Sequence, residues 1–396
     1  MDMDIAPLIK HFAENAPGFA ERIRESGLDT DKLNSVESLN SLPIIRKDDL
    51  ADLQAASPPF GGFLACDPSE LKRIYQSPGP IYDPEPRVAD YWRWESAMRA
   101  AGFGEYDVVL NAFGYHLTPA GAMFEEGLLA AGCAVIPGGI GNQEQQIQAM
   151  HTLGVTCYLG LPSYLKALLD KADEMGVTLK VNKAFVVAEP LPPSLRAELI
   201  ARGVTTVRQG YGTAECGNLG YECEKEEGWH LPTDAIIQVC DINSGQPLPA
   251  GETGEVVVTL FAKEYAIIRF GTGDLSAVHP EKCSCGLDTP RLMGWLGRVG
   301  DAVKVRGMFL HPRQLNGLMS EFGAVEKWQA QVSRSDHKDK LTLRVSPSSS
   351  SDIETLPERL SAAARENIKF RIEVEIVGAD EIPDDASPIE DLRSWN

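Results

Sequence analysis

Three cysteines and one histidine form a set of side chains that could bind a metal ion. They are Cys223, His230, Cys283 and Cys285, in the pattern Cys-x₆-His followed about fifty residues later by Cys-x-Cys-Gly. Three thiolates and one imidazole complete a tetrahedral Zn²⁺ shell with no open position, which is the composition of a structural site. The spacing is not that of a standard zinc finger. The alternative is four unconnected residues in β-rich loops, with Cys216 as a nearby competitor and Cys240 in an apolar strand of the core.

The carboxylate of Glu215 is a second candidate for metal chemistry. It follows the small residues Gly212, Thr213 and Ala214, where a strand is expected to lead into a loop. Mg²⁺ is a hard cation that binds few protein oxygens and completes its shell with water and substrate phosphate. Glu215 is therefore a candidate Mg²⁺ ligand. The alternative is an ordinary turn that carries a surface glutamate.

The elements that must position these residues can be read from the hydrophobic pattern. Short apolar runs alternate with segments of helical spacing; the runs are 107–112, 134–137, 156–161, 184–188 and 205–209, and the helical segments include 143–153 and 163–175. Such alternation is typical of a mostly parallel sheet covered by helices. After Gly210 the pattern becomes β-rich, and a hairpin is expected where 235–241 and 254–261 flank the turn-forming NSGQPLPAGETG.

The last part of the chain has a different pattern of predicted helices and strands. Residues 314–322, 339–345, 352–366 and 371–377 are expected to form helix, strand, helix and strand. A length of 396 residues favours more than one domain. We predict a large α/β domain with mostly parallel sheets at 1–297, including a β-rich subregion at about 215–297, and a small mobile α+β domain at 298–396.

Charge and composition exclude several classes of partner. The net charge is −20, from 57 acidic and 37 basic side chains, and such a surface repels the phosphate of nucleic acids and of anionic membranes. No run of 18 apolar residues occurs, and the N-terminal residues lack the pattern of a signal peptide. The eight cysteines are spread out rather than arranged as a disulfide framework. A cytoplasmic protein is expected.

Four stretches together resemble phenylacetate-CoA ligase and its relatives among the AMP-forming adenylating enzymes. They are GYHLTPAG at 114–121 with VIPGGIGNQEQQI and LPSY, AEPLPPSLRAEL at 188–199 with QGYGTAE, IIRFGTGDL at 267–275, and GRVGDAVKVRGMFLHP at 297–312. Any one is weak, but four in register indicate the fold. The resemblance implies that ATP activates a small carboxylic acid to an acyl adenylate, which coenzyme A converts to a thioester. It also implies a C-terminal domain that rotates between the two steps, and a homodimer.

The resemblance also implies roles for single residues. Asp274 matches the aspartate that accepts hydrogen bonds from both ribose hydroxyls, Arg298 matches a contact to ribose or phosphate, and Asp301 matches the interdomain hinge. The alternatives are a turn aspartate and an exposed hairpin with a weak ion pair. The remaining matches are Ala188, Glu189, Pro190, Tyr211 and Gly212 at the adenine site, Thr213 at phosphate, and Tyr115, His116, Gly138 and Gly139 in the acyl pocket, with His116 as a core histidine in the alternative.

Two elements depart from the family pattern. The stretch aligned with the phosphate loop, IYQSPGPIYDPEPRV at 74–88, has no Thr, no Lys and four prolines that lack an N–H donor. Asp83 and Glu85 are expected to add negative charge where polyphosphate would approach. The tail IPDDASPIEDLRSWN has no Lys, although the family uses a C-terminal Lys in adenylation; Lys369 and Arg393 are candidate substitutes. Losing one such charge costs about 3–4 kcal/mol of transition-state stabilisation.

These departures leave three functions open. The leading one is an AMP-forming ligase for an aromatic or other organic acid, with ATP or AMP, coenzyme A and Mg²⁺ as cofactors and a structural Zn²⁺. The second is an acyl transferase or coenzyme A-dependent helper that has lost adenylation. The third is a non-catalytic binding protein on the same scaffold, because one fold hosts several functions.

Overall fold

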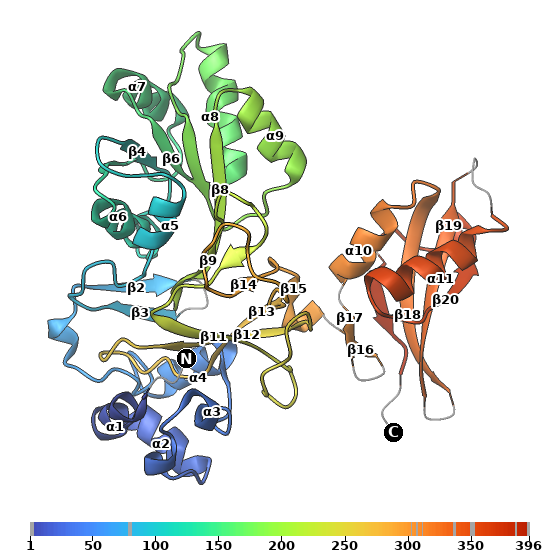
Figure 1. The fold of residues 1–396 in the computed structure, drawn as a ribbon, viewed down its shortest axis with the longest axis horizontal. Helices are drawn as coiled ribbons and strands as arrows, with labels where there is room; N and C mark the ends of the chain where they lie inside the picture. The colour runs from blue at the N-terminus through green and yellow to red at the C-terminus, as the bar shows by residue number, and fades with distance from the viewer. Residues whose placement is uncertain are drawn as a thin grey trace. The chain divides into compact units, whose positions relative to one another are not determined.

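The computed structural model describes residues 4–77, 81–301, 303–305, 308–310, 312–335, 338–348, 353–384 and 386–393. The chain divides into two compact units (Figure 1). The first comprises Met1–Thr272 and Ala277–Gly294, and the second comprises Gly273–Ser276 and Trp295–Asn396. The boundary at residue 297 between a large and a mobile domain stays a prediction.

An eight-stranded sheet of mixed direction runs through the first unit, in the order β14-β10-β9-β8-β7-β6-β4-β5. From β5 to β8 neighbouring strands pair in parallel, whereas from β8 to β14 they are antiparallel. The prediction of mostly parallel sheets was therefore wrong for half of this sheet. The strands are β4 (Val108–Asn111), β5 (Ala134–Pro137), β6 (Cys157–Gly160), β7 (Lys183–Val186), β8 (Thr206–Thr213), β9 (Gly217–Tyr221), β10 (Trp229–His230) and β14 (Arg291–Leu292).

Helical crossovers explain the parallel half, because parallel neighbours cannot be joined by a tight turn. The crossovers are α6 (Ala120–Ala130), α7 (Gln143–Leu153), α8 (Pro162–Glu174) and α9 (Pro193–Ala201). Helix α8 begins with Pro162 and buries Leu165, Leu168, Leu169 and Ala172 at helical spacing. After β8 the chain turns back at once through residues 214–216, which makes β9 antiparallel and places Glu215 at a turn.

A second sheet joins the N-terminal segment to residues more than 200 positions away. Its order is β1-β13-β12-β11, and β1 pairs in parallel with β13 through Ile45↔Phe270 and Arg46↔Gly271. The predicted hairpin is confirmed as β11 and β12, but β1 was not predicted. These strands are β1 (Ile45–Arg46), β11 (Ala235–Cys240), β12 (Gly254–Leu260) and β13 (Phe270–Ser276), and helices α1 (Ala6–Asn15), α2 (Pro17–Glu25), α3 (Val36–Leu39) and α4 (Lys47–Ala56) lie in the same part of the chain.

The second unit contains a four-stranded sheet in the order β20-β19-β18-β21 with its own apolar core. The predicted helix-strand-helix-strand succession is found as α10, β19, α11 and β20, and β18 and β21 are additional. The bounds are α10 (Pro312–Ser320), β18 (Val325–Ser335), β19 (Lys338–Pro347), α11 (Leu356–Asn367), β20 (Glu373–Ile376) and β21 (Ile389–Asp391), with the short strands β15 (Gly297–Arg298), β16 (Val303–Val305) and β17 (Met308–Leu310) before them. None of the helices in the described ranges has the length and apolarity needed to cross a bilayer.

A buried ion pair fixes the strands that lead to Glu215. Arg196 on α9 donates through Nη2 to both carboxylate oxygens of Glu222 at 2.7 and 2.9 Å. Glu222 also accepts hydrogen bonds from the backbone N–H and the side-chain amide of Gln209 on β8, at 2.9 and 2.8 Å. Glu222 therefore ties α9 and β8 together directly after β9 ends.

Replacement of Glu222 by Ala is expected to lower the free energy of unfolding by about 3–5 kcal/mol, because Arg196 would remain buried without its partner. Urea unfolding followed by tryptophan fluorescence measures this. Glu226→Ala is the matched control, since Glu226 contacts the same arginine at 3.3 Å but its side chain is 36% exposed. The control variant should lose less than about 1 kcal/mol of unfolding free energy. Equal losses in the two variants would contradict the importance of the buried pair.

Candidate active site and metal centre

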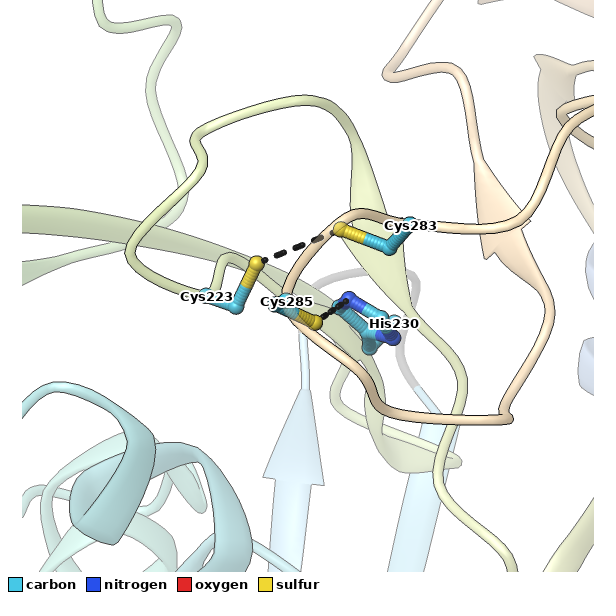
Figure 2. Close-up of side chains that lie close together, drawn as sticks. All are labelled: Cys223, His230, Cys283 and Cys285. Carbon is cyan, nitrogen blue, oxygen red and sulfur yellow. Dashed lines mark hydrogen bonds between the residues drawn. The ribbon is translucent and has the colours of Figure 1, made fainter.

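The structure brings the four predicted metal ligands together in the first unit (Figure 2). Their ligand atoms all lie within 4.8 Å of one another. Cys223 Sγ lies 3.7 Å from Cys283 Sγ, and Cys285 Sγ lies 3.4 Å from His230 Nε2. The sulfur–sulfur distance is far longer than the roughly 2.05 Å of a disulfide. The alternative of four unconnected residues is therefore wrong.

These distances can be compared with those of a zinc shell. Zn–S bonds of about 2.3 Å and Zn–N bonds of about 2.0–2.1 Å set tetrahedral edges of about 3.8 Å between two sulfurs and about 3.5 Å between sulfur and nitrogen. The observed pairs differ from these edges by about 0.1 Å. The donor set therefore fits Zn²⁺ in composition and in size.

Neighbouring groups already orient three of the four candidate ligands, His230, Cys223 and Cys285. Thr289 Oγ1 lies 2.8 Å from His230 Nδ1, which leaves Nε2 as the ring nitrogen that faces the sulfurs. The backbone N–H groups of Lys225 and Leu287 donate to the sulfurs of Cys223 and Cys285, each at 3.4 Å. Such contacts support negative charge on sulfur, the form that binds a metal.

Glu215 lies in the turn between β8 and β9, and its side chain is buried rather than on the surface. The residue is 2% exposed, and Lys47 Nζ at the start of α4 lies 2.6 Å from Glu215 Oε1. The alternative of a surface glutamate in an ordinary turn is therefore wrong. The carboxylate of Glu215, at the end of β8, offers the hard oxygen ligands that a divalent cation prefers.

The two acidic residues of the aligned phosphate loop are also buried, which corrects the expectation that both add charge to an open site. Glu85, fully buried on β3 (Ile81–Glu85), accepts a hydrogen bond from Tyr75 at 2.5 Å and pairs with Arg73 at 2.8 Å and Lys72 at 3.4 Å. Strands β2 (Arg73–Ser77) and β3 form an antiparallel hairpin, which explains the burial. Pro78 and Pro80 lie outside the described residues.

Asp83 differs from Glu85 because, among the residues that the structure describes, it forms no ion pair with a basic side chain. It is 1% exposed, and burial, followed by the charge of Glu215, raises its pKa to about 8. The Ser77 hydroxyl, which donates to Ile81 O at 3.4 Å, and the charge of Lys47 lower the pKa of Asp83 and offset part of this shift. Asp83 and Glu215 are thus two buried acidic groups within electrostatic reach of each other.

The residues before Glu215 are tightly packed. Tyr211 is buried and stacks on Trp229 with ring centroids 5.2 Å apart and an interplanar angle of 12°, so one face of its ring is occupied. A Cβ atom on Gly212 would lie 2.2 Å from Gly217 O, which explains the glycine. Thr213 Oγ1 accepts the backbone N–H of Cys216 at 3.2 Å and so closes the turn. Roles for Tyr211 and Thr213 with nucleotide stay predictions.

The segment at Ala188–Pro190 has an unusual backbone. Ala188 adopts a φ of +69°, in the left-handed region that residues other than glycine rarely enter. Glu189 accepts a hydrogen bond from Ser163 Oγ at 2.6 Å, at the start of α8. Strain of this kind is often retained at functional sites, which is consistent with a backbone that lines a ligand.

The predicted acyl-pocket residues lie at the ends of β4 and β5. The hydroxyl of Tyr115 donates to Glu125 at 2.7 Å and accepts from Asn111 at 2.9 Å, and burial together with the bond to Glu125 raises the pKa of Tyr115. A Cβ atom on Gly138 would lie 2.6 Å from Leu110 Cδ1, and Gly139 has a φ of +66°. His116 is exposed, so the alternative of a core histidine is wrong.

In the second unit, Asp274 and Arg298 face each other across the pairing of β13 with β15. Arg298 Nε lies 3.0 Å from Asp274 Oδ1, and Trp295 Nε1 donates to the same oxygen at 3.0 Å. Asp274 is buried while the side chain of Arg298 is 58% exposed. Asp301 ends the short helix η3 (Val299–Asp301), and its side chain is outside the described residues.

Comparison with known proteins shows what this chain is similar to. The model of the family described as "AMP-binding enzyme" matches residues 88–260. A phenylacetate-coenzyme A ligase of Aromatoleum evansii is 29% identical over 376 residues, which are 90% of this chain and 83% of the relative. The chain is similar to phenylacetate-CoA ligases over most of its length. A second such ligase, from Thermus thermophilus, is 28% identical over 85% of the chain and 78% of its own length.

Comparison with solved structures shows which fold the chain adopts. An open conformation of 2-hydroxyisobutyryl-CoA ligase, in complex with 2-HIB-AMP and CoA, has a TM-score of 0.87 and covers 97% of this chain and 89% of its own. Its sequence identity is 23%. The apo structure of MatB from Rhodopseudomonas palustris aligns with a TM-score of 0.51 over 83% of the chain. The architecture is thus that of adenylate-forming ligases.

One cation near the candidate site was missed from the sequence. Lys47 follows β1 and contacts Glu215, yet its neighbours in LPIIRKDDLADL read as the beginning of a surface helix. The candidate substitutes for the missing C-terminal lysine are engaged locally. Arg393 pairs with Asp391 and Asp339 at 2.7 and 3.1 Å, and Lys369 donates to Glu366 O at 2.8 Å.

Proposed function

We propose that this protein is an AMP-forming ligase that joins an organic carboxylic acid to coenzyme A through an acyl adenylate. The observation that carries the proposal is that phenylacetate-CoA ligases match 85–90% of the chain. The chain also contains the QGYGTAE and GTGDL segments that resemble this family. The named relatives act on phenylacetate, and one structural neighbour, a 2-hydroxyisobutyryl-CoA ligase, was solved in complex with 2-HIB-AMP and CoA. We therefore assign the substrate to small organic acids, aromatic ones included.

The reaction has two steps with defined bond changes. A carboxylate oxygen of the acid attacks the α-phosphorus of ATP, and the bond to pyrophosphate breaks. The sulfur of coenzyme A then attacks the acyl carbon, and AMP leaves with the electron pair of the acyl–oxygen bond. The protein contributes mainly by positioning the two reactants and by stabilising charge that develops between them.

Each residue of the candidate site has a place in this scheme. Asp274 would accept the two ribose hydroxyls, since a carboxylate offers two acceptor oxygens to a vicinal diol. Arg298 would contact ribose or phosphate, and Tyr211 with the strained backbone at Ala188 would border the base. Mg²⁺, when bound at Glu215, would supply positive charge against the phosphates. Tyr115 and Gly138 would shape the acyl pocket.

Pyrophosphate release tests the proposal. With ATP, Mg²⁺, coenzyme A and a panel of acids that includes phenylacetate, benzoate and 2-hydroxyisobutyrate, we expect at least one acid to give pyrophosphate and a thioester. Because the usual phosphate-loop lysine is missing, we expect a rate on the order of 0.01–0.1 s⁻¹, two to three decades below a typical turnover of about 10 s⁻¹. Absence of pyrophosphate with every acid contradicts the proposal.

The β2–β3 hairpin favours one second candidate, an acyl transferase that has lost adenylation. The hairpin buries Asp83 and Glu85 where a hydroxyl-rich phosphate loop was expected. Exchange of acyl groups between coenzyme A thioesters without ATP, in a protein that releases no pyrophosphate, would support that candidate and exclude the ligase.

We also propose that Cys223, His230, Cys283 and Cys285 hold a structural Zn²⁺. The proposal is supported by the donor set and by the two ligand–ligand distances of 3.7 and 3.4 Å. With four protein ligands the shell is complete, and the ion would then join the β9–β10 segment to the loop before β14 without entering the chemistry.

A further inference from the structure

A polar cavity of about 300 Å³ in the first unit is lined by the segment that leads into β1 and by the turn between β11 and β12. Two arginines contribute to its wall, Arg46 on β1 and Arg269 directly before β13. Its neutral polar side chains are those of Asn40, Ser41, Asn243, Ser244 and Gln246. None of the described lining residues is acidic, although the chain has a net charge of −20. The cavity is therefore basic in an acidic protein.

The guanidinium group of Arg269 is buried without an opposite charge. The residue is 1% exposed, and the partners of its guanidinium within the described ranges are neutral. Nη1 donates to Leu39 O at 3.3 Å and to Asn40 Oδ1 at 2.9 Å, and Nη2 donates to Gly245 O. Nε has no partner among these residues. Burying a charge is unfavourable unless an opposite charge and hydrogen bonds compensate it, so an anion at this position would be stabilised.

Two further arginines add positive charge near Arg269. Arg22 on α2 donates through Nη1 to Ile268 O at 2.6 Å, and burial, followed by the charge of Arg269, lowers the pKa of Arg22 to about 9. Arg46 Nε lies 3.3 Å from Oε2 of the buried Glu255. Within the described ranges, this is the one ion pair that any of the three guanidinium groups forms. Three arginines and one carboxylate leave an excess of positive charge.

The backbone holds the guanidinium group of Arg269 in a fixed position. Arg269 adopts a φ of +51°, in the left-handed region, and its backbone N–H donates to Thr259 Oγ1 at 2.9 Å. Strained backbone of this kind is often retained where a side chain serves a site. Gly245 has a φ of +67°, and a Cβ atom there would lie 3.5 Å from Arg269 Nη2. The turn thus packs closely against the guanidinium group.

Hydrogen bonds also fix the turn that forms the other wall. Asp241 Oδ1 accepts the backbone N–H groups of Asn243 and Ser244 at 3.2 and 2.8 Å. The side-chain amide of Gln246 donates to Asn40 O at 3.0 Å and so joins the turn to the segment before β1. The side chain of Asn243 is exposed and makes no hydrogen bond within the part of the chain that the structure describes. Its amide is therefore available to a ligand in the cavity.

We propose that this cavity binds a phosphate oxyanion, either inorganic phosphate or the phosphate group of a small metabolite. Planar guanidinium groups donate parallel hydrogen bonds to phosphate oxygens, and the amides and hydroxyls of the wall supply further donors. A volume of about 300 Å³ also leaves room for a short carbon chain. None of the lining residues belongs to the candidate active site, so the inference does not depend on the proposed ligase function.

Titration calorimetry of the purified protein with sodium phosphate tests the proposal, and we expect one phosphate per chain. Asn243→Asp should weaken binding at least tenfold, because it places a negative charge at the cavity while its exposed position leaves the fold intact. Asn182→Asp is the matched control, since Asn182 is exposed in the loop before β7 and the change in net charge is the same. Its phosphate affinity should stay within twofold of the unmodified protein.

Arg269→Gln removes the buried charge and should abolish phosphate binding; if this variant does not fold, Asn243→Asp decides. Phosphate should raise the thermal midpoint of the unmodified protein and of Asn182→Asp, but not that of Asn243→Asp. Tighter binding of glycerol 3-phosphate than of phosphate would identify a phosphorylated metabolite as the ligand, and weaker or equal binding would identify inorganic phosphate. Absence of saturable phosphate binding, an unchanged affinity in Asn243→Asp, or equal affinity for acetate overturns the inference.

Discussion

Cys283→Ser is expected to reduce bound zinc from about one ion per chain to less than about one tenth. A serine hydroxyl is a poor replacement for a thiolate, and three ligands do not complete a structural shell. Because the metal contributes directly to folding, the thermal midpoint should fall by roughly 5 °C or more. Mass spectrometry of the metal content and calorimetry measure the two effects.

Cys240→Ser provides the control for this experiment. Cys240 is fully buried on β11 in the same unit and does not belong to the metal-binding cluster. This variant should keep its zinc even where its stability drops. Zinc that persists in Cys283→Ser, or a protein without zinc after expression in zinc-supplemented medium, would reject the structural site.

Asp274→Ala should weaken AMP binding about one hundredfold, because two hydrogen bonds to a charged acceptor are worth roughly 3 kcal/mol together. Isothermal titration with AMP measures the change, and pyrophosphate release should fall in parallel. Trp295 and Arg298 would lose their contacts to Oδ1 in this variant. Asp288→Ala is suitable as a control, since Asp288 is an exposed partner of Lys282. Affinity within threefold of the unmodified protein would exclude a ribose contact.

The parallel half of the first sheet was predictable because its strands are short buried runs between helical segments. The strands β4, β6 and β7 are largely buried, and strands that are covered on both faces form continuous apolar runs. The antiparallel half was not recognised as part of the same sheet, since β10 and β14 are each two residues long. Strand β1 has the same length and pairs with a segment 225 residues later, which no local pattern reveals.

The metal-binding cluster and the candidate active site differ in how far the sequence determines them. Cysteine and histidine are few in this chain, so the residue types alone were enough to predict the four candidate ligands. The prediction succeeded although Cys223 and Cys283 are 60 residues apart. Lysine and aspartate are common on surfaces, and nothing local distinguishes Lys47 from its neighbours. Asp83 was expected to add negative charge where polyphosphate would approach, yet it lies on β3 of the β2–β3 hairpin and is buried.

The parallel pairing of β1 with β13 limits how the protein can be shortened for crystallisation or for a split reporter. A clone trimmed to residues 88–260, the segment that matches the family model, would omit both strands together with Lys47, Asp83 and two of the four clustered cysteine and histidine residues. Strand β12 would then present an unpaired edge, which invites self-association of the trimmed product. Insertions at the exposed turn near Ser244, between β11 and β12, leave these pairings intact.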